Sequence, residues 1–260
     1  MRVAIAGKGG AGKSVVTGTL ARVLGRRGER VLALDSDLLP GLTLSLGADA
    51  PERPPLLDAA ERGEDDRWRL KKGIGPVRAV QRFSTPAPDG VRVLQAGKAP
   101  PEGTQAIMPA LQAYYKVIHR LARTPAFGEW ALIADLPAGA RQLAYDWAPF
   151  ADTVLVVVEP TSQSLLTARR IMRVAGARPG VTVAAIANKV KVPADRERIE
   201  TFLGELVAAS LPADPAVAAA ERIGAAVIDY APRSPVLAAI ERLADELAED
   251  GPSQRSRLTR

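Results

Sequence analysis

A glycine-rich loop near the amino terminus constrains the fold more than any other feature of this 260-residue chain. A short apolar run, residues 3–6, leads into the loop, and a stretch with helical periodicity, residues 12–27, follows it. The loop matches the pattern G-x-x-x-x-G-K-[ST] and reads Gly7-Lys8-Gly9-Gly10-Ala11-Gly12-Lys13-Ser14. Its glycines let successive backbone N–H groups face phosphate oxygens, and the following helix presents its positive end to the same anions. The sequence therefore predicts a strand–loop–helix unit that binds a nucleotide.

Individual positions of this loop have expected roles. Lys13 should reach the β- and γ-phosphates, and the Ser14 hydroxyl should ligate Mg²⁺. A chance glycine turn is the alternative explanation, but the strand before the loop and the helix after it argue against chance. The residues expected to bind nucleotide here are Gly7, Lys8, Gly9, Gly10, Ala11, Gly12, Lys13, Ser14 and Val15.

Strand-like and helix-like segments alternate along most of the chain. Apolar runs are expected as strands over residues 3–6, 31–34, 91–94, 131–134, 153–158, 181–187 and 206–211. Helices are expected over residues 12–27, 106–121, 164–174, 196–202 and 234–249. Strands that are apolar throughout and alternate with helices indicate a parallel sheet covered on both faces. We therefore predict an α/β fold: a single doubly wound domain over residues 1–250, with a mostly parallel sheet and helices on both faces.

Two segments interrupt this pattern. Residues 48–90 are rich in proline, glycine and charge, and their weak periodicity predicts an irregular excursion within the domain. From Arg67 to Lys98 there are eight basic residues and one acid, Asp89. Such a run is either a solvated insertion or a docking surface for an acidic protein, an anionic membrane or nucleic acid. Residues 251–260 contain three arginines and no acid, and are expected to form a disordered basic tail.

Composition restricts the available chemistry. The chain contains no cysteine, so disulfides, thiolate metal sites and cysteine nucleophiles are excluded. No window is long and apolar enough for a transmembrane segment, and the amino terminus has no leader-like pattern. We therefore expect a cytoplasmic protein. The single histidine, His119, is expected as a surface residue on its helix.

Three aspartates follow predicted strands. Asp35 and Asp37 follow residues 31–34, and Asp135 follows residues 131–134. Ligand sites in open α/β sheets lie at the carboxyl edge of the strands, so these carboxylates should lie near the bound phosphates. The acid after an apolar strand is the Walker B pattern, which predicts that Asp135 holds Mg²⁺ through water. The alternatives are that Asp35 only caps a turn and that Asp135 only caps a helix.

The loop and later motifs resemble the MinD/ParA family of P-loop ATPases, whose deviant Walker A loop carries a lysine directly after the first glycine. Lys8 occupies that position. Further matches are Asp35-Ser36-Asp37, Asp135-Leu136-Pro137-Ala138-Gly139, Ala187-Asn188-Lys189 and Leu211-Pro212-Ala213-Asp214. The resemblance spans about residues 1–47 and 91–249. It implies a Mg²⁺-dependent ATPase that forms a homodimer on binding ATP and hydrolyses ATP to ADP and phosphate.

The resemblance also implies roles for single residues. Asp37 would orient the attacking water, and Lys8 would cross the dimer interface to the partner's nucleotide, which makes the implied catalytic set Asp37, Lys8 and Lys13. The implied Mg²⁺ site is Ser14, Asp35 and Asp135. Gly139 would sense the γ-phosphate through its N–H group, while Asn188 and Pro212 would contact the adenine base. The alternatives are that Lys8 is only a solvent-facing loop residue and that Asn188 is a plain turn residue. After Asp37, residues 38–41 read LLPG, which departs from the Pro and Asn usual in the family.

Within the family, residues 95–98, 135–139, 158–161 and 167–171 look most like the CooC-type ATPases that insert nickel into carbon-monoxide dehydrogenase. Those ATPases carry a Cys-x-Cys-Pro metal site, for which this chain has Ala106-Ile107-Met108-Pro109. Alanine offers no ligand and methionine only a soft thioether, so no transition metal is expected between subunits. Two functions stay open. One is a maturation or loading factor for an unidentified client enzyme. The other is a positioning ATPase that binds DNA or an acidic surface through basic patches; DNA is not favoured, and membrane binding is not expected.

Overall fold

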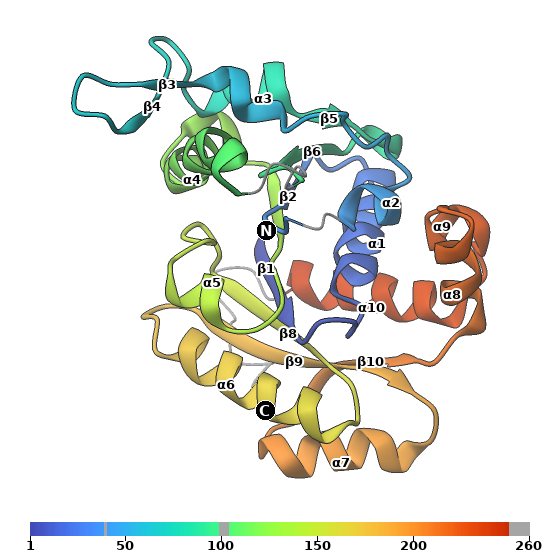
Figure 1. Ribbon diagram of the computed structural model, residues 1–260. Helices are drawn as coiled ribbons and strands as arrows, with labels where there is room; N and C mark the ends of the chain where they lie inside the picture. The colour runs from blue at the N-terminus through green and yellow to red at the C-terminus, as the bar shows by residue number, and fades with distance from the viewer. Residues whose placement is uncertain (39–40, 99–103, 250–260) are drawn as a thin grey trace.

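The computed structural model describes residues 1–38, 41–98 and 104–249, so the tail expected at 251–260 lies outside the described residues. An eight-stranded sheet runs through the molecule in the order β10-β9-β8-β1-β7-β2-β6-β5 (Figure 1). Every neighbouring pair is parallel except β5–β6, which is antiparallel. The strands are β1 Arg2–Gly7, β2 Val31–Asp35, β5 Thr85–Pro86, β6 Arg92–Gln95, β7 Ala131–Asp135, β8 Thr153–Val158, β9 Thr182–Val190 and β10 Val207–Pro212. The predicted fold class is confirmed.

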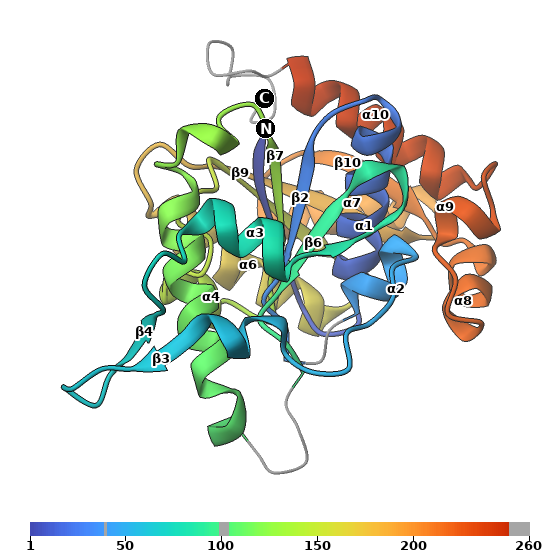
Figure 2. The ribbon, with the colours of Figure 1, turned by 90° about the horizontal axis from the view of Figure 1, so that it is seen from above.

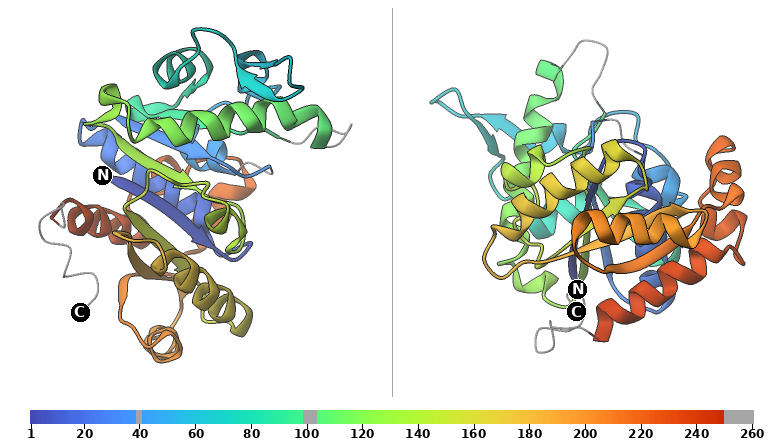
Figure 3. Two further views of the ribbon diagram at one scale, coloured as in Figure 1. Left: turned by 90° about the vertical axis from the view of Figure 1, so that its left-hand side faces the viewer. Right: turned by 90° about the horizontal axis from the view of Figure 1, so that it is seen from below.

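Helices cover both faces of this sheet (Figures 2 and 3). The α-helices are α1 Lys13–Arg26, α2 Leu42–Leu46, α3 Pro76–Phe83, α4 Met108–Leu121, α5 Arg141–Ala144, α6 Ser162–Gly176, α7 Pro193–Leu203, α8 Pro215–Arg222, α9 Val227–Tyr230 and α10 Pro235–Glu249. Short 3₁₀ turns are η1 Pro55–Ala59, η2 Pro88–Gly90, η3 Thr104–Ile107 and η4 Pro125–Phe127. None of the described helices is long and apolar enough to cross a membrane.

Side-chain alternation along the central strand divides the interior into two cores. Ala4 and Ala6 of β1 face the core that α4 and α6 cover, whereas Val3 and Ile5 face the core that α1 and α10 cover. Successive strand residues point to opposite faces, so a strand between two helical layers must be apolar at every position. This requirement explains the continuous apolar runs of the sequence. The strand order places β1 between β8 and β7, in the middle of the sheet.

The segment expected to be irregular contains regular structure. Residues 48–90 include η1, the antiparallel hairpin of β3 Ala60–Arg62 and β4 Trp68–Leu70, and the helix α3. The hairpin extends away from the sheet (Figures 1 and 2). Leu56, Ala59, Val80 and Phe83 are buried in the core that α4 also lines, so packing stabilises elements that are too short to show periodicity in the sequence.

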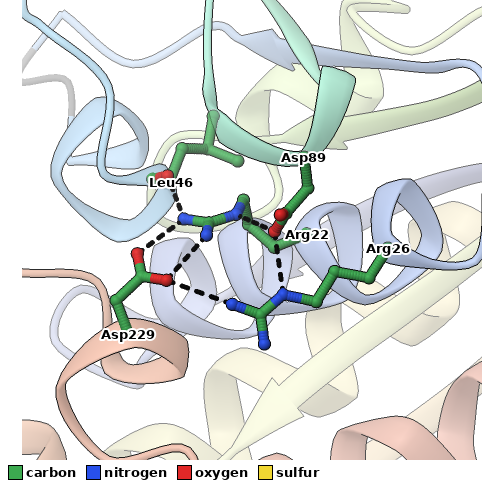
Figure 4. Close-up of polar contacts among 5 residues, drawn as sticks. All are labelled: Arg22, Arg26, Leu46, Asp89 and Asp229. Atoms are coloured by element: carbon green, nitrogen blue, oxygen red, sulfur yellow. Dashed lines mark hydrogen bonds and ion pairs between the residues drawn. The ribbon is translucent and has the colours of Figure 1, made fainter.

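A buried arginine joins α1 to three distant segments (Figure 4). Arg22 is 2% exposed; its guanidinium donates to the Leu46 carbonyl at 2.7 Å and forms ion pairs with Asp89 at 2.5 Å and Asp229 at 2.8 Å. Burial lowers the pKa of Arg22, but its bonds to the two carboxylates outweigh burial, and the net pKa is raised. The arginine therefore fixes α1, the helix after the phosphate loop, to α2, η2 and α9.

Candidate nucleotide-binding site

The glycine loop lies between β1 and α1, at the carboxyl edge of the sheet. Gly10 has a φ of 78° and Gly12 a φ of 93°, a backbone region that residues with a Cβ rarely adopt. Gly12 is the N-cap of α1, so the helix begins at Lys13, which is 8% exposed, with Ser14 and Val15 in the same turn. The Lys13 Nζ donates to the Lys8 carbonyl at 3.4 Å. The loop thus brings a buried ammonium and the positive end of α1 to the same place.

The three residues predicted to hold Mg²⁺ lie together. Ser14 donates from Oγ to Oδ2 of Asp135 at 2.6 Å, and Asp35 is directly opposite Asp135 across the β2–β7 ladder. Burial raises the pKa of Asp135 to about 6, although the Ser14 hydrogen bond and Lys13 act against this rise. Burial, followed by repulsion from Asp135, holds the pKa of Asp35 well above its ordinary value.

Asp35 also shapes the segment that follows it. Its Oδ1 accepts a hydrogen bond from the Asp37 N–H at 3.0 Å, and it also accepts the backbone N–H of Leu42 at the start of α2. Asp35 therefore caps this turn and also lies beside Asp135. Of the residues between these contacts, Leu38 is half-buried, while positions 39 and 40 lie outside the described residues.

The donor set fits a hard divalent cation. Asp35 Oδ2 and Asp135 Oδ1 are buried and have no hydrogen-bond partner among the described residues. Two such carboxylates close together favour a cation between them, because both burial and mutual repulsion disfavour their ionised forms. Mg²⁺ is commonly held by one or two carboxylates together with substrate phosphates and water. The described residues include no cluster of three or more His, Cys, Asp or Glu that could hold a metal by itself.

Asp37 and Lys8 flank this centre. Asp37 is half-buried and close enough to Asp35 and Asp135 to raise the pKa of both. Lys8 is also half-buried, and within the described ranges no residue pairs with its ammonium. Its backbone carbonyl accepts bonds from Lys13 Nζ and from the Ala11 N–H at 3.2 Å. The Lys8 side chain therefore takes no part in the contacts that hold its own loop.

The segment after Asp135 touches the phosphate loop. Gly139 adopts a φ of 90°, and its N–H donates to the Gly7 carbonyl at 3.0 Å. If this N–H contacts a γ-phosphate, as the family resemblance implies, its bond to Gly7 must break. This bond holds Gly139, the residue expected from the sequence to sense the γ-phosphate, beside the phosphate loop.

Asn188 lies near the end of β9, and Pro212 ends the neighbouring β10 opposite Val190, so both lie at the same edge of the sheet. Asn188 is 8% exposed, and its Nδ2 donates to the Ala11 carbonyl at 2.7 Å. Its Oδ1 accepts the Lys189 N–H at 2.9 Å. One amide hydrogen and one oxygen lone pair are then still available for a base. Asn188 thus also holds the phosphate loop, a role that the sequence did not predict.

Three further residues at this edge were missed from the sequence. Lys189, near the end of β9, contacts the loop, and Glu159, which follows β8, forms an ion pair with Lys189. Tyr114 of α4 is fully buried, and its hydroxyl lies near Ser36, Asp35 and Asp135, although no described residue forms a well-aligned hydrogen bond with it. Burial raises the pKa of Tyr114. The edge-of-sheet rule could have drawn attention to Glu159 and Lys189, but Tyr114 is indistinguishable in sequence from an ordinary core residue.

Two other predictions concern α4 and the turn before it. His119, expected at the surface, has a side chain only 31% exposed; its Nε2 lies 3.0 Å from the Asp146 carbonyl oxygen and its ring 4.2 Å from that of Tyr115. His119 therefore lies at the surface but is partly covered by the turn after α5. Ala106 is exposed and Met108 half-buried, at the positions where CooC-type ATPases carry thiolates.

Comparisons with known proteins agree with this geometry. A family model described as the CobQ/CobB/MinD/ParA nucleotide binding domain matches residues 3–228. The carbon monoxide dehydrogenase accessory protein CooC of Rhodospirillum rubrum is 29% identical over 247 residues, covering 89% of this chain and 91% of the relative. A ParA family ATPase from Chlorobium tepidum superposes with a TM-score of 0.72 at 22% identity, covering 95% of this chain and 98% of that one. The septum site-determining protein MinD of Pyrococcus horikoshii, complexed with Mg-ADP, gives 0.70 at 21% identity over 97% of both chains. At these identities the two structures show the fold alone.

Proposed function

This chain belongs to the CobQ/CobB/MinD/ParA nucleotide-binding family, and from that premise we propose that it is a Mg²⁺-dependent ATPase that hydrolyses ATP to ADP and phosphate. The observation that carries the proposal is the hydrogen bond from Ser14 to Asp135 beside the buried Lys13. This contact brings the phosphate loop and the acidic end of β7 into one site. Such a site offers both an anion-binding cradle and oxygen ligands for a metal.

Each residue has a defined task in the proposed reaction. Lys13 and the loop N–H groups hold the phosphates, while Ser14, Asp35 and Asp135 hold the metal. Bound Mg²⁺ would supply positive charge that offsets the charge on the phosphate oxygens. Asp37, which follows Asp35 at the exposed side of the carboxylate group, orients the attacking water. The Asn188 amide and Pro212 lie against the base, and Gly139 contacts the γ-phosphate.

The proposed working form is a homodimer that assembles on ATP. Lys8 supports it, because no described residue pairs with its ammonium and the loop already contains Lys13 as a phosphate ligand. Two ammonium groups this close repel each other unless anions lie between or beside them. The phosphates of a partner's nucleotide would be such anions, and binding across the interface would couple the nucleotide to assembly.

The proposed role is maturation or loading of a client enzyme in the cytoplasm, where ATP is available. The support is the overall similarity to a relative whose name describes an accessory protein of an enzyme, carbon monoxide dehydrogenase. Ala106 and Met108 do not offer the thiolates that a soft metal prefers. Action on the client would therefore rest on the nucleotide-dependent change of shape and not on a metal carried between subunits.

The alternative is a positioning ATPase that binds DNA or an acidic surface. Within the basic segment of residues 67–98, Arg69 is the one basic residue with an ion pair among the described residues, to Asp65 at 2.9 Å. The only acid within residues 67–98, Asp89, is bound by Arg22 and Arg26. Asp89 therefore does not neutralise the basic residues of its own segment, which keeps most of its positive charge. The client-enzyme role is preferred on the similarity to the accessory protein of carbon monoxide dehydrogenase.

Phosphate release by the full chain tests the catalytic proposal. We expect ATP turnover with Mg²⁺ and none after chelation by EDTA; turnover that ignores EDTA would overturn the proposed metal role. Fluorescence anisotropy with labelled duplex DNA and ATP tests the alternative. Tight binding at about 50 mM salt that is lost at about 200 mM would favour the positioning ATPase. The absence of binding at both concentrations would favour the client-enzyme role.

A further inference from the structure

Two consecutive residues at the end of β9 hold two consecutive carbonyl groups of the phosphate loop. Asn188 Nδ2 donates to the Ala11 carbonyl, and Lys189 Nζ donates to the Gly10 carbonyl, each at 2.7 Å. Asn188 can in addition contact a base, but the Lys189 ammonium is committed to the loop. Nothing in the glycine motif itself requires a lysine at this distance along the chain.

These contacts determine where the loop N–H groups point. A trans peptide directs its C=O and N–H in opposite directions, and the described chain contains no cis peptide bond. Holding the Gly10 and Ala11 carbonyls toward β9 therefore turns the N–H groups of Ala11 and Gly12 away from β9, toward the inner side of the loop. The Ala11 N–H donates to the Lys8 carbonyl at 3.2 Å, so a bound phosphate oxygen would have to share or replace this bond. Inward N–H groups are the ones that bind phosphate oxygens.

The ammonium of Lys189 is itself held in place. Glu159, at the end of β8, accepts an ion pair from Lys189 Nζ at 2.6 Å, and the Glu159 side chain is 13% exposed. Lys189 adopts a φ of 58°, a left-handed conformation that is unfavourable for a residue with a Cβ. The Asn188 Oδ1 accepts the Lys189 N–H at 2.9 Å and supports this conformation. A strained backbone at a charged contact suggests that the position of the ammonium has a function.

We propose that Lys189, anchored by Glu159, is a positioning residue that orients the phosphate loop for nucleotide binding. This inference rests on the proposed ATPase function and gives Lys189 and Glu159 roles that the family resemblance did not assign. The ammonium acts through the Gly10 carbonyl and not as a phosphate ligand, because the Glu159 carboxylate offsets its charge. The loop binds phosphate before and during hydrolysis, so loss of the contact should weaken binding and leave the chemical step nearly unchanged.

Calorimetric titration of the full chain with ATP and Mg²⁺ tests the proposal. Lys189→Met keeps the length of the side chain but removes the ammonium, and should raise the ATP Kd about fivefold to tenfold. At saturating ATP its turnover should stay within about twofold of the original. Lys189→Arg should recover most of the affinity. Lys191→Met is the matched control, because Lys191 is an exposed neighbour whose side chain has no contact with the loop, and its Kd should not change.

Glu159→Ala separates orientation from simple charge. If Lys189 acted only as a positive charge, removal of a nearby carboxylate would strengthen ATP binding. If Lys189 orients the loop, Glu159→Ala should weaken binding, because the ammonium loses its anchor. Tighter binding by Glu159→Ala, or an unchanged Kd for Lys189→Met, would overturn the inference. Should Glu159→Ala fail to fold, the Kd and turnover of Lys189→Met and Lys189→Arg still decide it. Failure of the unsubstituted chain to bind ATP would instead reject the proposed function.

Discussion

Ser14 and Asp135 lie 121 residues apart in the chain, yet the hydroxyl of Ser14 donates a 2.6 Å hydrogen bond to the carboxylate of Asp135. This contact joins the first turn of α1 to the end of β7. The serine is half-buried and the aspartate 1% exposed, so water cannot easily replace either partner. Substitutions in the loop and at the strand ends should therefore affect one shared site, but each should change a different property of it, such as binding, hydrolysis or stability.

Lys13→Ala should weaken ATP binding at least tenfold, on the order of 1.4 kcal/mol. Lys13 is the buried ammonium of the loop, and without it the triphosphate charge is poorly compensated. Isothermal titration with ATP and Mg²⁺ measures the change, with Lys191→Ala as a control at an exposed position. Equal affinities for Lys13→Ala and the unsubstituted chain would remove the phosphate-loop assignment.

Asp37→Ala should still bind ATP but hydrolyse it about 10²–10⁴ times more slowly. Asp37 lies beside Asp35 and Asp135 but is more exposed than either, as expected for a group that orients water and does not hold the metal. Single-turnover phosphate release measures the rate, and Asp49→Ala provides an exposed acidic control. Near-normal turnover of Asp37→Ala would assign the water-orienting role to another residue.

Lys8 should control assembly. With ATP, Asp37→Ala should run as a dimer, because bound nucleotide is no longer consumed, whereas the same protein with ADP should shift toward monomer. Adding Lys8→Ala should restore the monomer without abolishing ATP binding, since Lys13 and the loop N–H groups remain. Light scattering of the three samples measures the mass. A dimer that persists regardless of nucleotide and of Lys8 would indicate constitutive assembly.

Asp135 should make metal-free stability depend on pH. Burial raises the pKa of Asp135 to about 6 from 3.8, so between these values the folded chain binds a proton that the unfolded chain releases. Stability should thus fall as pH rises from about 4 to about 6 and then level off, and Asp35 is shifted in the same direction. The asparagine of Asp135→Asn cannot titrate. As pH rises from about 4 to about 6, the free energy of unfolding of this variant should therefore increase relative to that of the original chain, by about 2–3 kcal/mol at most.

Urea unfolding in EDTA at several pH values measures this difference. Asp49→Asn, an exposed substitution of the same type, should show no such trend. Parallel curves of unfolding free energy against pH for Asp135→Asn and the original chain would mean that Asp135 keeps its ordinary pKa in the folded chain.

Arg22→Met should lower the free energy of unfolding by about 2 kcal/mol or more. The substitution leaves Asp89, Asp229 and the Leu46 carbonyl without their buried donor, although both carboxylates are partly exposed and regain some water. Arg26→Met, which removes a 42% exposed partner of the same carboxylates, should cost about 1 kcal/mol or less. Urea unfolding compares the two. Equal losses would mean that the buried position of Arg22 adds nothing.

Local signals in the sequence predicted much of the fold and the site's main residues. The apolar runs and the glycine loop, which contains Ser14, are signals contained within short windows. The rule that strand ends share an edge then predicted that Asp35 and Asp135 lie near this loop. The hairpin at residues 60–70 left no such signal. Its strands have three residues each, and its stability comes from packing beside α4, which no short window of sequence displays.

The contacts of Lys189, Tyr114 and His119 could not be predicted from the sequence, for related reasons. Lys189 reaches the loop only because β8 and β9 are neighbours and because its own backbone is left-handed. Tyr114 shares the buried stripe of α4 with ordinary apolar residues, so its hydroxyl position depends on where the helix lies against β2 and β7. His119 is partly covered by a turn that is distant in sequence. Each of these contacts depends on tertiary structure.

The two borders of the sheet limit how copies of this chain can associate. On one side β5 has only two residues, runs antiparallel and includes Pro86, which has no N–H to donate. On the other side β10 ends in Pro212, and its register with β9 shifts twice. Edge strands with these features discourage a strand of a second molecule from pairing with the sheet. The folded protein should therefore resist forming fibrils by pairing of its edge strands. Copies of the chain would have to associate through side-chain surfaces, which a bound ligand can expose or cover.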